Sequence, residues 1–268
     1  MPTIDVADTT LYYEDSGPGS SGQTVVFSHG LLWNTELFAP QVAALKGRYR
    51  CIAWDHRGQG RSAPEERHCI GMELVWKDAV ALLEKLGTGP VHFCGLSMGG
   101  FVAMRMGARR PDLVRSLVLL ETSADPEPPE NRDRYRLLAS VTRWLGAGVV
   151  MGKVARIMLG RTFLQDPARA EERERAKAVM SARKDIWRAV GGVVERAGIY
   201  DELARIAAPT LVVVGEEDVA TVPAKAERLA AAIRGARLVR IAAAGHSSSI
   251  EQPEAVTRAI ADFLAAQA

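Results

Sequence analysis

Residues 91–100, VHFCGLSMGG, join a short apolar run to the small-residue sequence GLSMGG. The apolar run is typical of a buried strand, and the residues from Phe101 onwards have a helix-forming composition. Ser97 therefore stands at a predicted strand-to-helix junction, with Gly95 and Gly99 two residues away on either side. Such a turn would hold a serine hydroxyl exposed above the edge of a sheet, and its strained backbone requires small neighbours. The stretch predicts a nucleophilic serine, with an ordinary turn serine as the alternative.

The composition is that of an ordinary globular protein. The chain has 268 residues, of which 47% are hydrophobic and 25% charged, with 34 basic and 32 acidic side chains and a net charge of +2. These values argue against a disordered or fibrous chain. A net charge this small also gives no electrostatic reason to expect a nucleic acid or an anionic membrane as a partner.

The N-terminal sequence and the cysteines indicate a cytoplasmic protein. MPTIDVADTT has no basic segment followed by an apolar one, so no signal peptide is expected, and no apolar run is long enough to span a bilayer. Cys51, Cys69 and Cys94 are predicted to be buried, reduced thiols. No histidine and carboxylate cluster has the spacing of a metal site, and no cofactor is expected.

Predicted strands alternate with predicted helices along most of the chain, which indicates a parallel sheet because parallel neighbours need a crossover connection. A short hairpin comes first, with its turn near Asp8 and Thr9. The later strands are expected at 24–28, 50–54, 91–94, 116–120, 210–215 and 236–241, and the helices at 36–46, 72–86, 98–109, from Pro223 and from Pro253.

A helical insertion interrupts this alternation. Residues 123–131, SADPEPPEN, contain three prolines, and the pattern from there to Ile206 is helical. We therefore predict a core of residues 1–124 and 207–268, with a helical cap of residues 125–206. One apolar face of the first cap helix is expected to contain Leu137, Leu138, Val141, Trp144 and Leu145.

A serine nucleophile needs a base that can work near neutral pH, which favours histidine. The chain has five histidines: His29, His56, His68, His92 and His246. His246 lies directly after the last predicted strand and before the last helix, at the carboxyl edge of the sheet where catalytic groups of such folds gather. We expect His246 to be the base.

The base in turn needs a carboxylate that orients its ring. Residues 215–223, GEEDVATVP, follow a predicted strand and offer Glu216, Glu217 and Asp218. Asp218 is the preferred acid, with a turn residue before the next helix as the alternative. Asp125, after the neighbouring strand, is the alternative acid.

Taken together, these segments resemble the α/β-hydrolase family over nearly the whole chain. Ser97, Asp218 and His246 also follow one another in the order expected of hydrolases with a nucleophile elbow. The resemblance rests on five motifs: His29-Gly30, the segment DHRGQGRS at 55–62, GLSMGG at 95–100, GEED at 215–218 and Gly245-His246.

The resemblance implies an eight-stranded, mostly parallel sheet flanked by helices, with the cap inserted after the sixth strand. It also implies that the backbone N–H groups of Leu31 and Met98 form an oxyanion hole. In that family His29 usually braces a loop, and the stretch of residues 55–62 is usually a structural turn beside the site.

A serine rather than an aspartate at the elbow favours hydrolysis of esters or lactones through an acyl-enzyme. Locally the sequence is similar to β-ketoadipate enol-lactonases at the elbow and the acid loop, and to cofactor-free haloperoxidases, perhydrolases and carboxylesterases at 28–33. The alternatives are a C–C bond hydrolase of dienoate substrates, a perhydrolase or haloperoxidase-like activity, and a non-catalytic ligand receptor.

The expected partner is a small ester or lactone, bound by a monomer or a homodimer. Four side chains are predicted to contact it: Leu32, Trp33, Trp144 and Val219. Leu32 and Trp33 follow the expected oxyanion loop, Trp144 belongs to the cap, and Val219 belongs to the acid loop.

Overall fold

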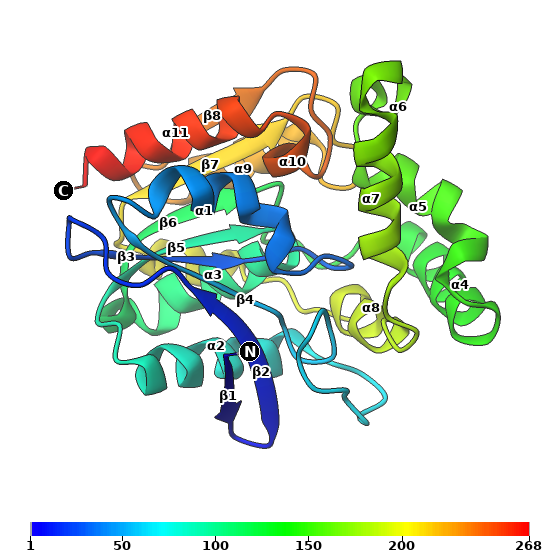
Figure 1. Ribbon diagram of the computed structural model, residues 1–268, viewed down its shortest axis with the longest axis horizontal. Helices are drawn as coiled ribbons and strands as arrows, with labels where there is room; N and C mark the ends of the chain where they lie inside the picture. Colours follow the sequence, from blue (N-terminus) through cyan, green and yellow to red (C-terminus); the bar gives the residue numbers. More distant parts are fainter. Residues whose placement is uncertain (1, 268) are drawn as a thin grey trace.

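Eight strands form one sheet in the computed structural model, which describes residues 2–267 (Figure 1). Their order across the sheet is β1-β2-β4-β3-β5-β6-β7-β8; the pairs β1–β2 and β2–β4 are antiparallel and the others are parallel. The strands are β1 Thr3–Val6, β2 Thr9–Asp15, β3 Thr24–Ser28, β4 Arg50–Trp54, β5 Val91–Leu96, β6 Val114–Leu120, β7 Thr210–Gly215 and β8 Arg237–Ile241. The predicted eight-stranded, mostly parallel sheet is confirmed.

Helices cover both faces of this sheet. Side chains on both faces of a strand such as β3 are therefore buried. Val26 packs into the core on one face of the sheet, and Val25 and Phe27 pack into the core on the other. Central strands that are buried on both faces have continuous apolar sequences, which is why β3, β5 and β7 do not alternate between apolar and polar residues. The helices of the core are α1 Ala39–Leu45, α2 Met72–Leu86, α3 Met98–Arg109, α9 Pro223–Ala232, α10 Ser248–Glu251 and α11 Pro253–Ala265.

The two layers can be followed in Figure 1. The helices α1 and α11 lie together on one side of the sheet, and their apolar residues share a core with Val25 and Phe27. The helices α2, α3 and α9 bury their apolar faces in the core that contains Val26. Strand β5 leads directly into α3, so the junction at Ser97 lies at the carboxyl end of the central strand.

The helical insertion follows β6, the sixth strand, as predicted. It contains α4 Pro129–Leu145, α5 Met151–Met158, α6 Arg161–Gln165, α7 Ala170–Ser181 and α8 Trp187–Val194. In Figure 1 these helices stand beyond one end of the sheet, apart from the two layers that flank it. Among residues 2–267, no helix is long and apolar enough to cross a membrane.

The orientation of α4 differs from the expected one. Leu138 points into the protein, but Leu137, Trp144 and Leu145 are exposed. The helical period is as predicted, whereas the buried face is rotated because the cap packs over a cavity rather than onto a closed core. Cys69 is also exposed, contrary to the prediction that all three thiols are buried, since it lies in an irregular loop.

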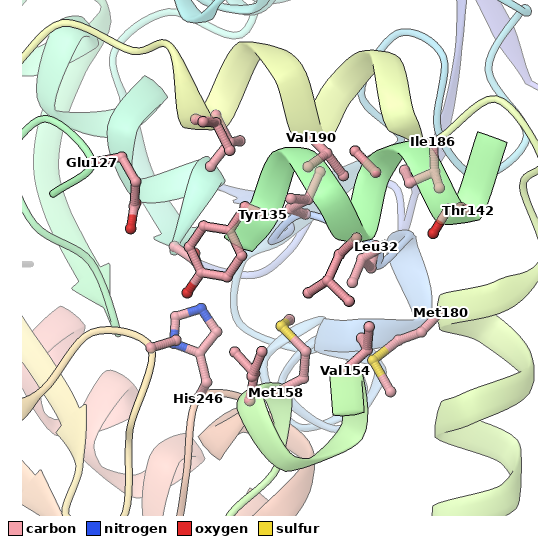
Figure 2. A pocket seen from close by; sticks show the side chains of 18 of the residues that line it. Leu32, Glu127, Tyr135, Thr142, Val154, Met158, Met180, Ile186, Val190 and His246 are labelled. Atoms are coloured by element: carbon pink, nitrogen blue, oxygen red, sulfur yellow. The ribbon is translucent and has the colours of Figure 1, made fainter. Parts of the chain in front are cut away.

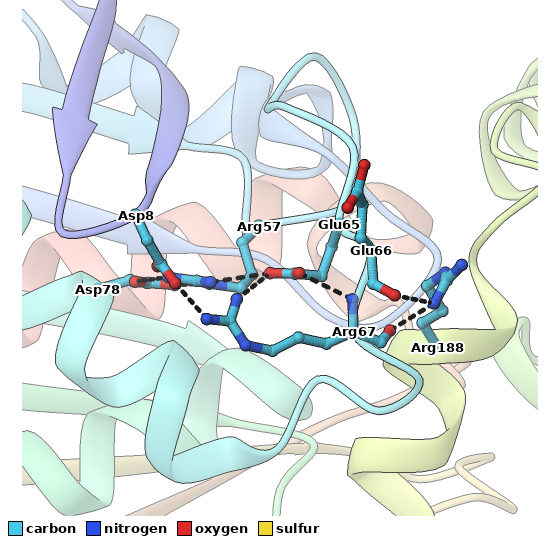
Figure 3. A network of polar contacts seen from close by, with 7 residues as sticks. All are labelled: Asp8, Arg57, Glu65, Glu66, Arg67, Asp78 and Arg188. Carbon is cyan, nitrogen blue, oxygen red and sulfur yellow. Dashed lines mark hydrogen bonds and ion pairs between the residues drawn. The ribbon is translucent and has the colours of Figure 1, made fainter.

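That loop is held by a network of charges around Arg57 (Figure 3). The buried Arg57 guanidinium donates to Asp78 at 2.6 Å and to Glu65 at 2.8 Å, and Asp78 is itself fully buried. Arg188 of α8 donates to the backbone carbonyl oxygens of Glu66 and Arg67 in the same loop. The loop therefore connects the cap to the core beside the carboxyl end of the sheet.

Candidate active site

The backbone at Ser97 is strained in the way a sharp strand-to-helix turn requires. Ser97 has φ +50° and ψ −108°, an unusual conformation for a residue with a side chain. Its N–H donates to the carbonyl oxygen of Leu120 at 2.8 Å, which fixes the turn to β6. A Cβ at Gly99 would overlap the carbonyl oxygen of Ser28, and a Cβ at Gly95 would overlap that of Gly99. Both glycines are therefore needed for the close packing of the turn.

His246 and Asp218 meet at the same edge of the sheet. Nδ1 of His246 lies 2.9 Å from Oδ2 of Asp218, and both side chains are buried. The other oxygen of Asp218 accepts from the N–H groups of Ala220 and Thr221 at 2.8 and 2.9 Å. These contacts hold the carboxylate so that one oxygen faces the imidazole. Asp125, the alternative acid, instead accepts a hydrogen bond from the hydroxyl of its neighbour at position 123.

The loop that carries His246 rests on a buried carboxylate, Glu251. One oxygen of Glu251 accepts from the N–H groups of Gly160 and Gly245 at 2.7 and 2.9 Å, and the other accepts from that of Ser247 at 3.0 Å. The acceptor thus fixes the backbone on both sides of His246 and ties it to the cap residue Gly160. Burial raises the pKa of the Glu251 carboxyl, against the opposing effect of these N–H groups.

Two backbone N–H groups are free near Ser97. Met98 begins α3, so its N–H has no partner within the helix and faces outwards from the positive end of the helix dipole. The N–H of Leu31 has no hydrogen-bond acceptor among the described residues. The loop is held in place next to it, where the N–H of Leu32 donates to the side chain of Gln59 at 3.2 Å.

The other four histidines lie outside the cavity that His246 lines. His29 and His56 pack edge-on in the interior, and burial lowers the pKa of His29 to about 4 and that of His56 well below its usual range. Burial likewise lowers the pKa of His92, within β5, to about 4. His68 is exposed in a loop and packs edge-on against Trp187. Among residues 2–267, no group of three or more His, Cys, Asp or Glu side chains could hold a metal ion.

Ser97 and His246 open into one cavity of about 130 Å³ between the sheet and the cap (Figure 2). In this view the hydroxyl of Tyr135, on α4, points toward the His246 ring. Most of the lining is apolar: Leu31, Leu32, Phe101, Leu138, Ala139, Val150, Met151, Val154, Ile157, Met158, Met180, Ile186, Val190, Val193, Val194 and Ala220. The polar members are Ser97, Glu127, Tyr135, Thr142, Arg196, Thr221 and His246.

The four predicted substrate contacts have different positions. Leu32 lines both this cavity and a separate hollow, whereas the buried Trp33 lines only the separate hollow. Trp144 and Val219 are 76% and 63% exposed, and neither is among the residues that line the cavity. The helical spacing predicts a substrate contact for Trp144, but the face of α4 that lines the cavity carries Tyr135 instead.

Sequence reasoning missed the only carboxylate and the only guanidinium among the described residues that line the cavity. These are Glu127 and Arg196, which form an ion pair of 2.8 Å. They are 69 positions apart, so no local pattern connects them. The charged pair Glu195-Arg196 within the otherwise apolar and glycine-rich sequence GGVVERAG, residues 191–198, was the available signal for Arg196.

Comparison with known proteins agrees with this geometry. The chain belongs to the alpha/beta hydrolase family, whose sequence profile matches residues 25–259. RutD of Caulobacter sp. (strain K31), named provisionally as a carbamate hydrolase, is 29% identical over 96% of this chain and 97% of its own.

Two solved structures are similar over their full length. A thermophilic esterase from Thermogutta terrifontis has a TM-score of 0.91 and 29% identity, covering 100% of this chain and 99% of the esterase. The enol-lactonase from Burkholderia xenovorans LB400 has a TM-score of 0.90 and 29% identity, covering 98% and 100%. Family membership and these neighbours identify the protein as a hydrolase, and the expected family resemblance is confirmed.

Proposed function

We propose that the enzyme hydrolyses carboxylic esters or lactones through an acyl-enzyme on Ser97. One observation carries the proposal: the strained Ser97 turn opens into an apolar cavity that His246, bonded to Asp218 at 2.9 Å, also lines. An apolar cavity with a few convergent polar groups is the usual form of a site for a small organic substrate.

Each residue has a separate role in the proposed reaction. The Ser97 hydroxyl attacks the carbonyl carbon while Nε2 of His246 takes its proton, and Asp218 holds the imidazole in the required tautomer. The N–H groups of Leu31 and Met98 donate to the oxyanion of the tetrahedral intermediate. A donor of this kind contributes about 3–4 kcal/mol in comparable sites. His246 then returns the proton to the leaving alcohol and activates a water that releases the acid.

Residues 125–206 serve in this proposal as the cap that determines which acyl group fits. The cap supplies the methionine, valine and isoleucine side chains over the cavity, whereas the core supplies the reacting groups. The similar proteins named as esterase and enol-lactonase favour an ester or lactone as the substrate class. We further propose a cytoplasmic enzyme, a monomer or homodimer, whose partner is this small molecule rather than a nucleic acid or a membrane.

The test compares Ser97→Ala with a matched control, Ser140→Ala, on the exposed side of α4. With p-nitrophenyl butyrate as substrate, kcat should fall by about 10⁴-fold or more in Ser97→Ala and stay unchanged in the control. A Ser97→Ala enzyme that keeps its esterase activity, or a wild type that hydrolyses no ester or lactone in a panel of graded chain lengths, contradicts the proposal.

A further inference from the structure

The cavity contains one buried ion pair, and it lies close to the reacting groups. Arg196 donates from Nη1 to Glu127 at 2.8 Å, and the two side chains are only 5% and 10% exposed. The Arg196 guanidinium also lies over the ring of Phe101, 4.3 Å from its centroid. Phe101 is one turn of α3 beyond Ser97, on the order of 6 Å along the helix axis.

The two charges of this ion pair cancel, but some N–H groups of Arg196 lack a hydrogen-bond acceptor. Nη1 of Arg196 is shared between Glu127 and the carbonyl oxygen of Val193, whereas neither the enclosed Nε nor the more accessible Nη2 has an acceptor among the described residues. The carboxylate of Glu127 is better satisfied, because its other oxygen accepts from the side chain of Asn131 at 3.1 Å. A buried N–H without an acceptor is costly, so this site favours a ligand that brings an acceptor.

From this arrangement we propose that the enzyme selects neutral acyl groups that carry a hydrogen-bond acceptor and rejects acyl groups that carry a carboxylate. The proposal rests on the ester or lactone hydrolysis proposed above and adds the substrate class. The acceptor, such as a second carbonyl oxygen, accepts from the unbonded Nη2 group of Arg196 while the scissile carbonyl lies at Ser97.

Charge explains why a carboxylate is excluded. Glu127 already neutralises Arg196, so an ionised acyl group would leave one uncompensated negative charge in an apolar cavity. Burying such a charge costs several kcal/mol, whereas a neutral carbonyl forms the same hydrogen bond without that cost. No second cation is among the cavity-lining residues that the structure describes.

The positions in Figure 2 agree with an acceptor near the scissile bond. Glu127 lies on the same side of the cavity as Tyr135 and His246, and Met180 and Ile186 lie on the far side. The polar end is thus next to the reacting groups, and the apolar end accommodates the remainder of the substrate.

The experiment compares three p-nitrophenyl esters with the same six-carbon acyl chain: the hexanoate, the ester of monomethyl adipate and the ester of adipic acid with its free carboxylate. At pH 7.5 we expect kcat/KM for the methyl adipate ester to exceed that for the adipate ester by about 100-fold or more, given the cost of burying an uncompensated charge. It should also exceed that for the hexanoate ester. An adipate ester or a hexanoate ester hydrolysed as well as the methyl adipate ester overturns the proposal.

Glu127→Gln should improve hydrolysis of the adipate ester relative to the methyl adipate ester, a gain that a purely structural role of Glu127 would not predict. The variant leaves Arg196 as an unpaired cation in the cavity, so the preference against the adipate ester should shrink by about tenfold or more. The control is Glu130→Gln, on the exposed start of α4, which should keep the wild-type preference. A preference in Glu127→Gln equal to that of wild type contradicts the charge argument.

Labelling by a fluorophosphonate probe separates the two proposals. Wild type and both variants should be labelled at Ser97, which reports a folded site whatever the acyl preference. A labelled enzyme that prefers the carboxylated ester refutes only the substrate class, whereas an unlabelled wild type refutes the proposed function itself.

Discussion

Replacing Glu251 with glutamine removes the charge that holds the His246 loop. The carboxylate accepts three backbone N–H groups, at 2.7, 2.9 and 3.0 Å, from Gly160, Gly245 and Ser247. Glutamine has a single oxygen, so its amide nitrogen must face at least one of these donors. One or two charge-assisted hydrogen bonds are then lost, each contributing about 1.5–3 kcal/mol.

The burial of Glu251 reduces the net effect. Its pKa is raised because the ionised carboxylate is poorly solvated, and a neutral amide avoids that cost. We therefore expect a net loss of about 2 kcal/mol in the free energy of unfolding, which corresponds to a fall of about 4–8 °C in Tm.

The same change should affect catalysis more than binding. A shift of about 1 Å in His246 lowers kcat by about 10- to 100-fold, whereas the apolar cavity and hence KM should change little. Thermal unfolding and ester hydrolysis are compared with those of Glu254→Gln, an exposed neighbour at the start of α11. If Glu251→Gln matches this control in both Tm and kcat, the supporting role of the carboxylate is refuted.

The remaining predictions concern the folded framework. Gly99→Ala places a Cβ against the carbonyl oxygen of Ser28. Esterase activity should fall, and the free energy of unfolding, measured with urea, should decrease by about 1–3 kcal/mol. An unchanged free energy of unfolding would contradict the need for glycine at this position. Asp78→Asn leaves the buried guanidinium of Arg57 without its main counter-charge. The free energy of unfolding should decrease by about 3 kcal/mol or more in the same urea measurement. A urea midpoint equal to that of wild type contradicts this prediction.

A further prediction in this group concerns pH. The pKa of His92 is about 4 when folded and about 6.5 when unfolded, so the unfolded state takes up the proton first and stability falls with decreasing pH. Between pH 7 and pH 5, His92→Gln should lose about 2 kcal/mol less than wild type, and equal losses would exclude His92 as a source of acid sensitivity.

The fold was predictable because its signals are local. The apolar runs of β3, β5 and β7, the prolines at the starts of α9 and α11 and the glycines around Ser97 each act within a few residues. The alternation of strands and helices then specifies a parallel sheet. The contact between Asp218 and His246 was also predictable from the sequence, because both residues lie in loops after strands that end at the same edge of the sheet.

The contacts within the cap could not be predicted from local sequence signals. The helical period of α4 was predictable, but which face is buried depends on what lies opposite, so Trp144 was expected to contact the substrate and is exposed instead. Glu127 and Arg196 are brought together by the packing of α4 and α8 over the cavity, as is the contact of Glu251 with Gly160. These are tertiary contacts between segments that are distant in sequence, and no periodicity encodes them.

The most direct test of the account is to react the wild-type protein with a fluorophosphonate and map the adduct by peptide mass spectrometry. The account predicts a single, stoichiometric adduct on Ser97, with loss of all esterase activity and no adduct in Ser97→Ala. Active enzyme without an adduct, or an adduct on another serine whose formation removes the activity, would contradict the assignment of Ser97 as the nucleophile.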